Sequence, residues 1–190
     1  MSSQKTIILF VRHAQSVYGE DDRARPLTEA GLRDRAIVLE TLKERKIDAF
    51  LCSPYERSLA TIRPAADYFR MEIRTDERFR ERKAGSHESG LLARRWADFS
   101  FAEEGGESLG SVQERNMAAM RDVLAEYAGQ TVVIGTHGTA MSTVLHYYNP
   151  DFGLAGFLRI VDRMPCIIEM TFQSGRSPEI RELAWVDKSE

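Results

Sequence analysis

Two histidines and two arginines each come shortly after an apolar stretch of the chain, where their side chains could meet. They are Arg12, His13, Arg57 and His137. A guanidinium group binds a tetrahedral oxyanion through paired hydrogen bonds. Positive neighbours also disfavour the imidazolium form, so that a histidine between them keeps a free lone pair. A neutral His13 beside a bound phosphate would be a nucleophile, which predicts a covalent phosphohistidine intermediate.

A phosphate ester also needs a proton for its leaving alcohol. Glu81 is the best candidate, because a carboxyl group beside a bound phosphate can keep its proton and act as a general acid. Glu81 lies in a charged run, and its neighbours there are expected to form a solvated face. These neighbours are Glu77, Arg78, Arg80, Arg82 and Lys83.

The apolar stretches before these residues predict the strands that position them. They are residues 7–11, 48–52 and 131–134. Short apolar runs of this kind are typical of strands buried on both faces of a sheet. In open α/β sheets, ligands bind at the carboxyl ends of the strands, so neighbouring strands would bring the four side chains together. Helices that start after Ser53 and Gly138 would add backbone N–H donors for the same anion.

The remaining elements alternate in the same way. Helices are predicted at residues 28–46, 53–69, from 107 onward and 138–146, and further strands at 71–75, 166–172 and 180–186. Thr28 is suited to an N-cap, and Ser111 and Glu114 have the spacing of a capping box. This order predicts one α/β domain over residues 1–190, a three-layer α/β/α sandwich with a mainly parallel central sheet.

Residues 84–106 show no clear periodicity and are expected to be a lid or specificity segment. Trp96 is interpreted as packing within this lid. Arg94 and Arg95 could bind a substrate carboxylate or phosphate, or could simply form a charged exterior. His87 and His146 are expected to be structural or surface residues.

Composition limits the partners. The chain has 190 residues, a net charge of −3, 43% apolar and 29% charged residues. These values argue against a nucleic-acid binder, a membrane protein or a disordered chain. Cys52 and Cys166 lie in apolar surroundings and are expected to be buried free thiols, consistent with a reducing cytoplasm. We expect no metal or other cofactor, and the oligomeric state stays open, with a homodimer as one alternative.

The motifs resemble those of the histidine phosphatase superfamily (phosphoglycerate-mutase-like, branch 1), in the family's order. They are Arg12-His13-Ala14, Leu27-Thr28-x-x-Gly31, Ser53-x-x-x-Arg57-x-x-x-Thr61, Arg78-x-Arg80-Glu81, Gly105-Gly106-Glu107-Ser108 with Arg115, and Thr136-His137-Gly138. The resemblance implies that His13 is phosphorylated, that Arg12, Arg57 and His137 bind the phosphoryl group, and that Glu81 is the acid and base. It implies no metal.

Two positions depart from the family pattern. Ala14 replaces the usual glycine, and Gly19 stands where the family often has an asparagine whose amide contacts phosphate. The loss of that contact leaves Ser16 or Gln15 to compensate.

The leading hypothesis is a metal-independent phosphatase for a small phosphorylated metabolite. The alternatives are a cofactor-dependent phosphoglycerate mutase and an inactive phospho-ligand-binding module. The presence of both histidines, both arginines and Glu81 disfavours the inactive module. The resembling mutases are longer and carry a Tyr-Gly segment after the acidic residue, whereas here Glu81 is followed by Arg82-Lys83-Ala84-Gly85. This difference favours hydrolysis.

Overall fold

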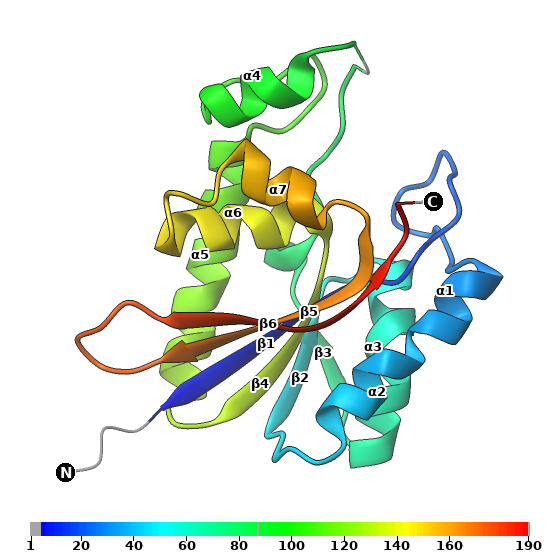
Figure 1. Ribbon diagram of the computed structural model, residues 1–190, viewed down its shortest axis with the longest axis vertical. Coiled ribbons are helices and arrows are strands. Elements are labelled where there is room, and N and C mark those ends of the chain that lie inside the picture. The colour runs from blue at the N-terminus through cyan, green and yellow to red at the C-terminus, as the bar shows by residue number, and fades with distance from the viewer. Residues whose placement is uncertain (1–4, 87, 190) are drawn as a thin grey trace.

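A six-stranded sheet forms the centre of the molecule in the computed structural model, which describes residues 5–86 and 88–189. The strand order is β3-β2-β4-β1-β5-β6 (Figure 1). The strands are β1 (Thr6–Arg12), β2 (Ala49–Cys52), β3 (Ile73–Thr75), β4 (Thr131–Thr136), β5 (Arg163–Phe172) and β6 (Glu179–Asp187). β3, β2, β4 and β1 are parallel, and β5 and β6 continue the sheet antiparallel. The predicted mainly parallel sheet is therefore confirmed.

Helices cover both faces of this sheet (Figure 1). One layer holds α1 (Glu29–Asp34), α2 (Ala36–Leu42) and α3 (Glu56–Phe69). The other holds α5 (Leu109–Glu126), α6 (Gly138–Tyr148) and α7 (Leu154–Ile160), with α4 (Leu91–Ala97) beyond them. These three layers confirm the predicted α/β/α sandwich.

The residues of β1 explain why its sequence is apolar throughout. Ile8 and Phe10 pack in the core beneath α5 and α6, whereas Leu9 and Val11 pack in the core beneath α2 and α3. All four side chains are fully buried. A strand covered by helices on both sides has no solvent face and needs no polar alternation.

Several predicted elements differ in the structure. The helix expected over residues 28–46 is two short helices, α1 and α2, which meet at Arg35. Thr28 is the N-cap as predicted, since its side chain accepts from the Gly31 N–H. The predicted cap at Ser111 is wrong: Ser108 caps α5, and its side chain accepts from the Ser111 N–H at 3.1 Å. The cap thus lies one helical turn earlier than the capping-box spacing suggested.

The sequence did not predict α4 or α7. Each has only seven residues, and no residue of α4 is fully buried. A helix this short carries too few apolar positions for a period to stand out. Residues 84–106 therefore contain a helix where irregular structure was expected.

Two further observations concern the described residues. Cys52 and Cys166 are free and buried, as predicted. Among the described helices, none combines the length and apolar character that crossing a membrane requires.

Candidate active site

The ends of three adjacent strands bring the four predicted residues together. β4 lies between β1 and β2, and its last residues accept the His13 N–H at 3.1 Å and the Ser53 N–H at 2.9 Å. Arg57 Nε lies 3.2 Å from His13 Nε2, and the ring centroids of His13 and His137 are 5.2 Å apart. The convergence at the carboxyl ends of the strands is the geometry that the sequence predicts.

Hydrogen bonds fix the tautomer of His13. Its Nδ1–H donates to the Ala14 carbonyl at 2.7 Å, and its Nε2 accepts from Arg57 Nε. Burial lowers the pKa of His13 well below its usual value, and the charges of Arg12 and Arg57 lower it further. The arginines alone were expected to lower this pKa, but burial is the larger cause. The imidazole is neutral, with its lone pair on Nε2.

Arg12 is held from one side. Its Nη1 donates to the carbonyls of Ile160 at 2.9 Å and Val161 at 2.7 Å, at the end of α7. Its Nε is buried and has no hydrogen-bond partner within residues 5–86 and 88–189. Gly138 lies against the guanidinium, where a Cβ would be 3.1 Å from Arg12 Cζ. The site therefore holds a fixed arginine with an unused buried donor.

Arg57 is only 1% exposed and has three polar contacts. Besides His13, it contacts Asp22: Nη1 donates to the Asp22 carbonyl at 2.5 Å, and Nη2 lies 3.3 Å from the Asp22 carboxylate. Burial lowers the pKa of Arg57, and the Asp22 carboxylate opposes that effect. The largely exposed loop of residues 19–26 thus places Asp22 at the site.

The same loop brings a third arginine, Arg25, whose Nη2 lies 2.9 Å from the Asp22 carboxylate. Sequence reasoning missed both residues. Their closeness in the chain to Leu27-Thr28 was the available signal, because that motif is bound to Gln15 and Ser16 in the loop after β1.

His137 is the residue before α6 and is completely buried. Its Nε2 lies 2.7 Å from Ser53 Oγ, and its ring packs against Tyr55 with centroids 5.0 Å apart. Its Nδ1 has no partner in the described part of the chain. Burial lowers the pKa of His137 well below the usual value, and the neighbouring His13 adds to the effect. A neutral histidine here can donate one hydrogen bond to a bound anion.

Glu81 lies at the N-terminus of α6. One carboxylate oxygen, Oε2, accepts the Thr139 N–H at 3.0 Å, and Oε1 accepts the N–H groups of Ala140 at 3.0 Å and Arg82 at 2.8 Å. These bonds use three of about four acceptor positions of a carboxylate, so Oε2 keeps one. The amides of this helix were expected to bind the phosphate, but Glu81 accepts two of them.

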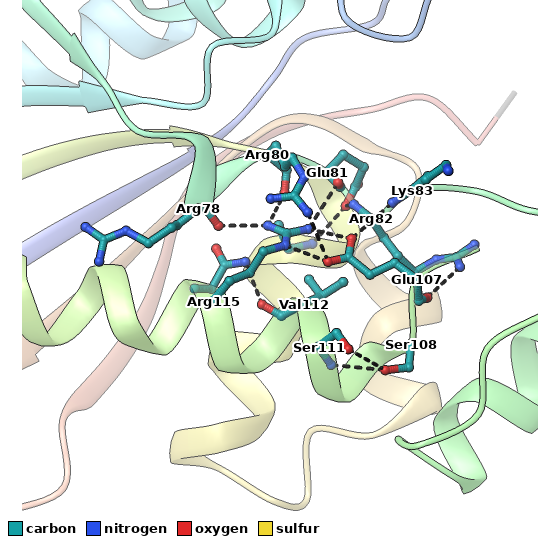
Figure 2. A network of polar contacts seen from close by, with 12 residues as sticks. Arg78, Arg80, Glu81, Arg82, Lys83, Glu107, Ser108, Ser111, Val112 and Arg115 are labelled. Carbon is teal, nitrogen blue, oxygen red and sulfur yellow. Dashed lines mark hydrogen bonds and ion pairs between the residues drawn. The ribbon is translucent and has the colours of Figure 1, made fainter. Parts of the chain in front are cut away.

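Arg115, from α5, fixes the backbone that carries Glu81 (Figure 2). Its guanidinium donates to the carbonyls of Arg78 and Arg80, both at 2.7 Å, and of Glu81 at 3.1 Å. The Glu107 carboxylate accepts from Arg115 Nε at 2.8 Å and from Nη2 at 2.9 Å. The Gly-Gly-Glu-Ser motif and the helical arginine thus act on the acidic segment.

Glu103 ties residues 84–106 to the rest of the molecule. Its carboxylate is 2% exposed and lies 2.9 Å from Arg82 Nη1 and 2.7 Å from Arg95 Nη2. Burial opposes its ionisation, but the hydrogen bonds from Arg95 and Arg82 prevail and lower the pKa of Glu103 to about 2. The expectation that Arg82 belongs to a solvated face is wrong. Arg95 is bound within the lid, and Arg94 lies over the Phe101 ring at 3.8 Å.

Aromatic contacts hold the same segment on α6 and α7. Trp96 packs against Phe99 and Phe157, with centroids 5.6 Å apart in each pair, and against His146. Trp96 therefore packs within the lid, as predicted, and His146 is structural. His87 lies outside the described residues.

In the described part of the chain, the side chains of Gln15 and Ser16 make no hydrogen bond to the four central residues; both residues support the loop after β1. The Gln15 carbonyl accepts the Thr28 N–H at 3.0 Å, and Ser16 pairs with Leu27 in an isolated bridge. At Gly31, a Cβ would come within 2.1 Å of the Gln15 carbonyl oxygen, so this contact requires glycine. A cavity of about 540 Å³ lies beside Gln15 and the C-terminal residues Asp187, Lys188 and Ser189. A direct phosphate contact from Ser16 or Gln15 stays a prediction.

Comparisons with known proteins identify the family and the fold. The family model described as histidine phosphatase superfamily (branch 1) matches residues 8–185. Phosphoserine phosphatase 1 of Hydrogenobacter thermophilus is 28% identical over 152 residues, which are 70% of this chain and 72% of the relative. Phosphoglycerate mutase-like protein 4 of Arabidopsis thaliana is 26% identical over 164 residues, 76% of this chain and 71% of the relative.

The solved structure of a mycobacterial glucosyl-3-phosphoglycerate phosphatase has a TM-score of 0.77 to this chain. The match covers 95% of this chain and 98% of that structure, at 19% identity. At this identity the likeness concerns the fold.

Proposed function

The chain belongs to the histidine phosphatase superfamily (branch 1), and from this premise we propose that it is a phosphatase that works through a phosphohistidine on His13. One observation carries the proposal. The His13 lone pair lies on Nε2, where it accepts from Arg57 Nε, while Nδ1–H is held by the Ala14 carbonyl and Arg12 keeps an unused Nε donor. A neutral, oriented imidazole between two arginines is suited to attack a bound phosphoryl group.

In the first step, the phosphoryl oxygens bind to Arg12, Arg57 and His137. The Nε2 lone pair of His13 attacks phosphorus, and the bond from phosphorus to the ester oxygen breaks. Glu81 gives a proton to the departing oxygen, which leaves as an alcohol. Arg12 and Arg57 stabilise the charge that spreads over the phosphoryl oxygens.

In the second step, water enters the place of the alcohol. The Glu81 carboxylate takes a proton from this water as its oxygen attacks phosphorus. The bond between phosphorus and Nε2 breaks, and its electron pair returns to His13. The products are inorganic phosphate, the free imidazole and a Glu81 that carries a proton again.

The proposed substrate is a small phosphorylated metabolite, and no metal takes part. The Hydrogenobacter relative is named a phosphoserine phosphatase, which supports this class of substrate. We assign the choice among such substrates to residues 84–106, because they lie next to the segment that carries Glu81 and are fastened to it through Glu103.

Hydrolysis is favoured over phosphoglycerate mutase activity. A mutase must hold the glycerate carboxylate while the phosphoenzyme is protected from water. Arg94 and Arg95 are the arginines of α4 that could do so, and both are engaged within the lid by Phe101 and Glu103. Water would therefore accept the phosphoryl group.

The test uses purified protein in the presence of a metal chelator. A panel of phosphomonoesters that includes phosphoserine is assayed for release of inorganic phosphate. In parallel, 3-phosphoglycerate is supplied with catalytic 2,3-bisphosphoglycerate, and both 2-phosphoglycerate and free phosphate are followed. We expect phosphate release without isomerisation. Rapid isomerisation with negligible phosphate release would establish the mutase instead, and a strict metal requirement would refute the mechanism.

A further inference from the structure

A carboxylate of the protein lies between two arginines of the pocket. Asp22 Oδ1 is 3.3 Å from Arg57 Nη2 and 2.9 Å from Arg25 Nη2. Arg57 is the residue whose Nε also reaches His13 Nε2. A carboxylate bridging two guanidinium groups has the charge and the geometry of a bound oxyanion.

Arg25 has the features of a binding residue. Its side chain is 17% exposed, and its Nε is buried without a hydrogen-bond partner within the described residues. Its stem runs beside Gly19, where a Cβ would lie 3.6 Å from Arg25 Cγ. Its charge is close enough to lower the pKa of both His13 and Arg57. Arg25 is therefore a guanidinium with an unused donor that shares the Asp22 carboxylate with Arg57.

We propose that Arg25 is a third anion-binding arginine of this pocket and that Asp22 is its displaceable counter-ion. The dianionic phosphate of a phosphomonoester takes the place of the Asp22 carboxylate between Arg25 and Arg57. The inference deepens the proposed function, on which it rests, because it assigns a substrate-binding residue to the same site.

The loop allows this exchange without unfolding. The Asp22 side chain is 47% exposed and can rotate into solvent, while its backbone carbonyl stays bonded to Arg57 Nη1. The Arg23 carbonyl accepts the Glu56 N–H at 2.9 Å, which anchors the loop on α3. Only a side-chain rotation is needed to uncover Arg25.

Charge favours the incoming phosphate. A carboxylate brings one negative charge and two oxygens, whereas a phosphomonoester near neutral pH brings up to two charges and three terminal oxygens. Arg12, Arg25 and Arg57 surround the pocket with positive charge, and Asp22 and Glu81 balance part of it. Departure of Asp22 leaves a pocket matched to a dianion.

Isothermal titration calorimetry with inorganic phosphate, on the full chain near neutral pH, tests the proposal. Asp22→Asn removes the competing carboxylate, and we expect the dissociation constant to fall about tenfold. Arg25→Gln removes the arginine and should raise it by about the same factor. Glu20→Gln, which removes one negative charge from the same exposed loop, is the matched control and should change it less than about twofold.

The double variant Asp22→Asn/Arg25→Gln separates the proposal from a general field effect. The gain from Asp22→Asn should largely disappear when Arg25 is absent, because the freed donor is then missing. Far-ultraviolet circular dichroism and thermal unfolding of each variant show whether the loop change has disturbed the fold.

Two results would overturn the inference without refuting the proposed function. Weaker phosphate binding by folded Asp22→Asn protein would mean that Asp22 orients Arg57. Unchanged binding by Arg25→Gln protein would mean that Arg25 only supports the loop. Either result overturns the inference. Both leave the proposed function standing if the wild-type protein still forms phosphohistidine. A wild-type protein that neither binds phosphate nor releases it from esters would refute both.

Discussion

Arg57 Nε donates to His13 Nε2 at 3.2 Å, so the arginine covers the lone pair that the proposed reaction uses. The same guanidinium contacts Asp22 through its two other nitrogens. An incoming phosphoryl group must draw Arg57 onto its own oxygens and thereby release Nε2. Binding of the substrate and exposure of the nucleophile are thus one event.

The covalent role of His13 gives the first prediction. His13→Ala removes the attacking nitrogen, so kcat should fall by about four powers of ten or more. The wild-type protein mixed with radiolabelled substrate and quenched should carry an acid-labile, base-stable label that the variant lacks. His146→Phe keeps an aromatic ring at a histidine outside the pocket and should label like the wild type. A fully active His13→Ala protein would exclude the mechanism.

The buried histidines predict a pH dependence of stability. In the unfolded chain, His13 and His137 take up protons as the pH falls through about 6.5, while the lowered pKa values keep both neutral in the fold. The unfolded state then binds more protons, so the free energy of unfolding decreases below pH 6.5, by up to about 1.4 kcal/mol per pH unit for each histidine. Above pH 6.5 this contribution is constant.

Urea unfolding between pH 5.5 and 7.5 measures this slope. His137→Gln should remove about half of the histidine contribution. Nitrogen-15 NMR of the imidazoles should show His13 neutral at pH 6, with its proton on Nδ1, as the bonds to Ala14 and Arg57 indicate. A His13 imidazole that titrates near 6.5 would contradict the burial argument.

The loss of activity on replacing Glu81 should depend on how strongly the leaving group needs a proton. Alkoxide leaving groups require one, whereas p-nitrophenolate scarcely does. Glu81→Gln should therefore slow alkyl phosphates by about 10²- to 10⁴-fold and p-nitrophenyl phosphate far less. The ratio of kcat/KM for the two substrate types is the measurement. Equal losses would mean that Glu81 serves binding or structure, for instance as the partner of the Thr139 and Ala140 amides.

Arg115 should act through Glu81. Arg115→Met removes the donors to the Arg78, Arg80 and Glu81 carbonyls, so the acid loses its fixed position. We expect the same selective loss on alkyl phosphates as in Glu81→Gln, smaller in size, and partial recovery with Arg115→Lys. Arg121→Met, an exposed change on the same helix, is the control. A variant that loses stability but keeps the alkyl-to-aryl ratio would show a structural role alone.

The sequence predicted the central strands and the four converging residues because local patterns specify them. The run before Arg12 is apolar at every position since β1 is covered on both faces, and such a strand ends where the polar residues begin. Asp22 and Arg25 left no comparable signal. Their loop has no period. Asp22 contacts Arg57, which is 35 residues away in the chain, and Arg25 reaches the site through Asp22.

The sequence did not predict the contacts of the lid, for a related reason. In the sequence, Arg82 and Arg95 resemble the other surface charges. Only the fold shows that both form ion pairs with the buried Glu103. The helix cap is Ser108 and not Ser111; serine suits the N-cap at either position, so residue type alone does not distinguish them.

Helix α7 contacts two different parts of the protein, the lid and Arg12. Near its middle, Phe157 packs against Trp96 of the lid. At its C-terminal end, the Ile160 and Val161 carbonyls accept hydrogen bonds from Arg12. A change in the tilt of α7 at Phe157 would therefore shift the carbonyls that hold Arg12. A substitution at Phe157 would therefore alter the support both of the proposed specificity segment and of Arg12, the proposed phosphate ligand.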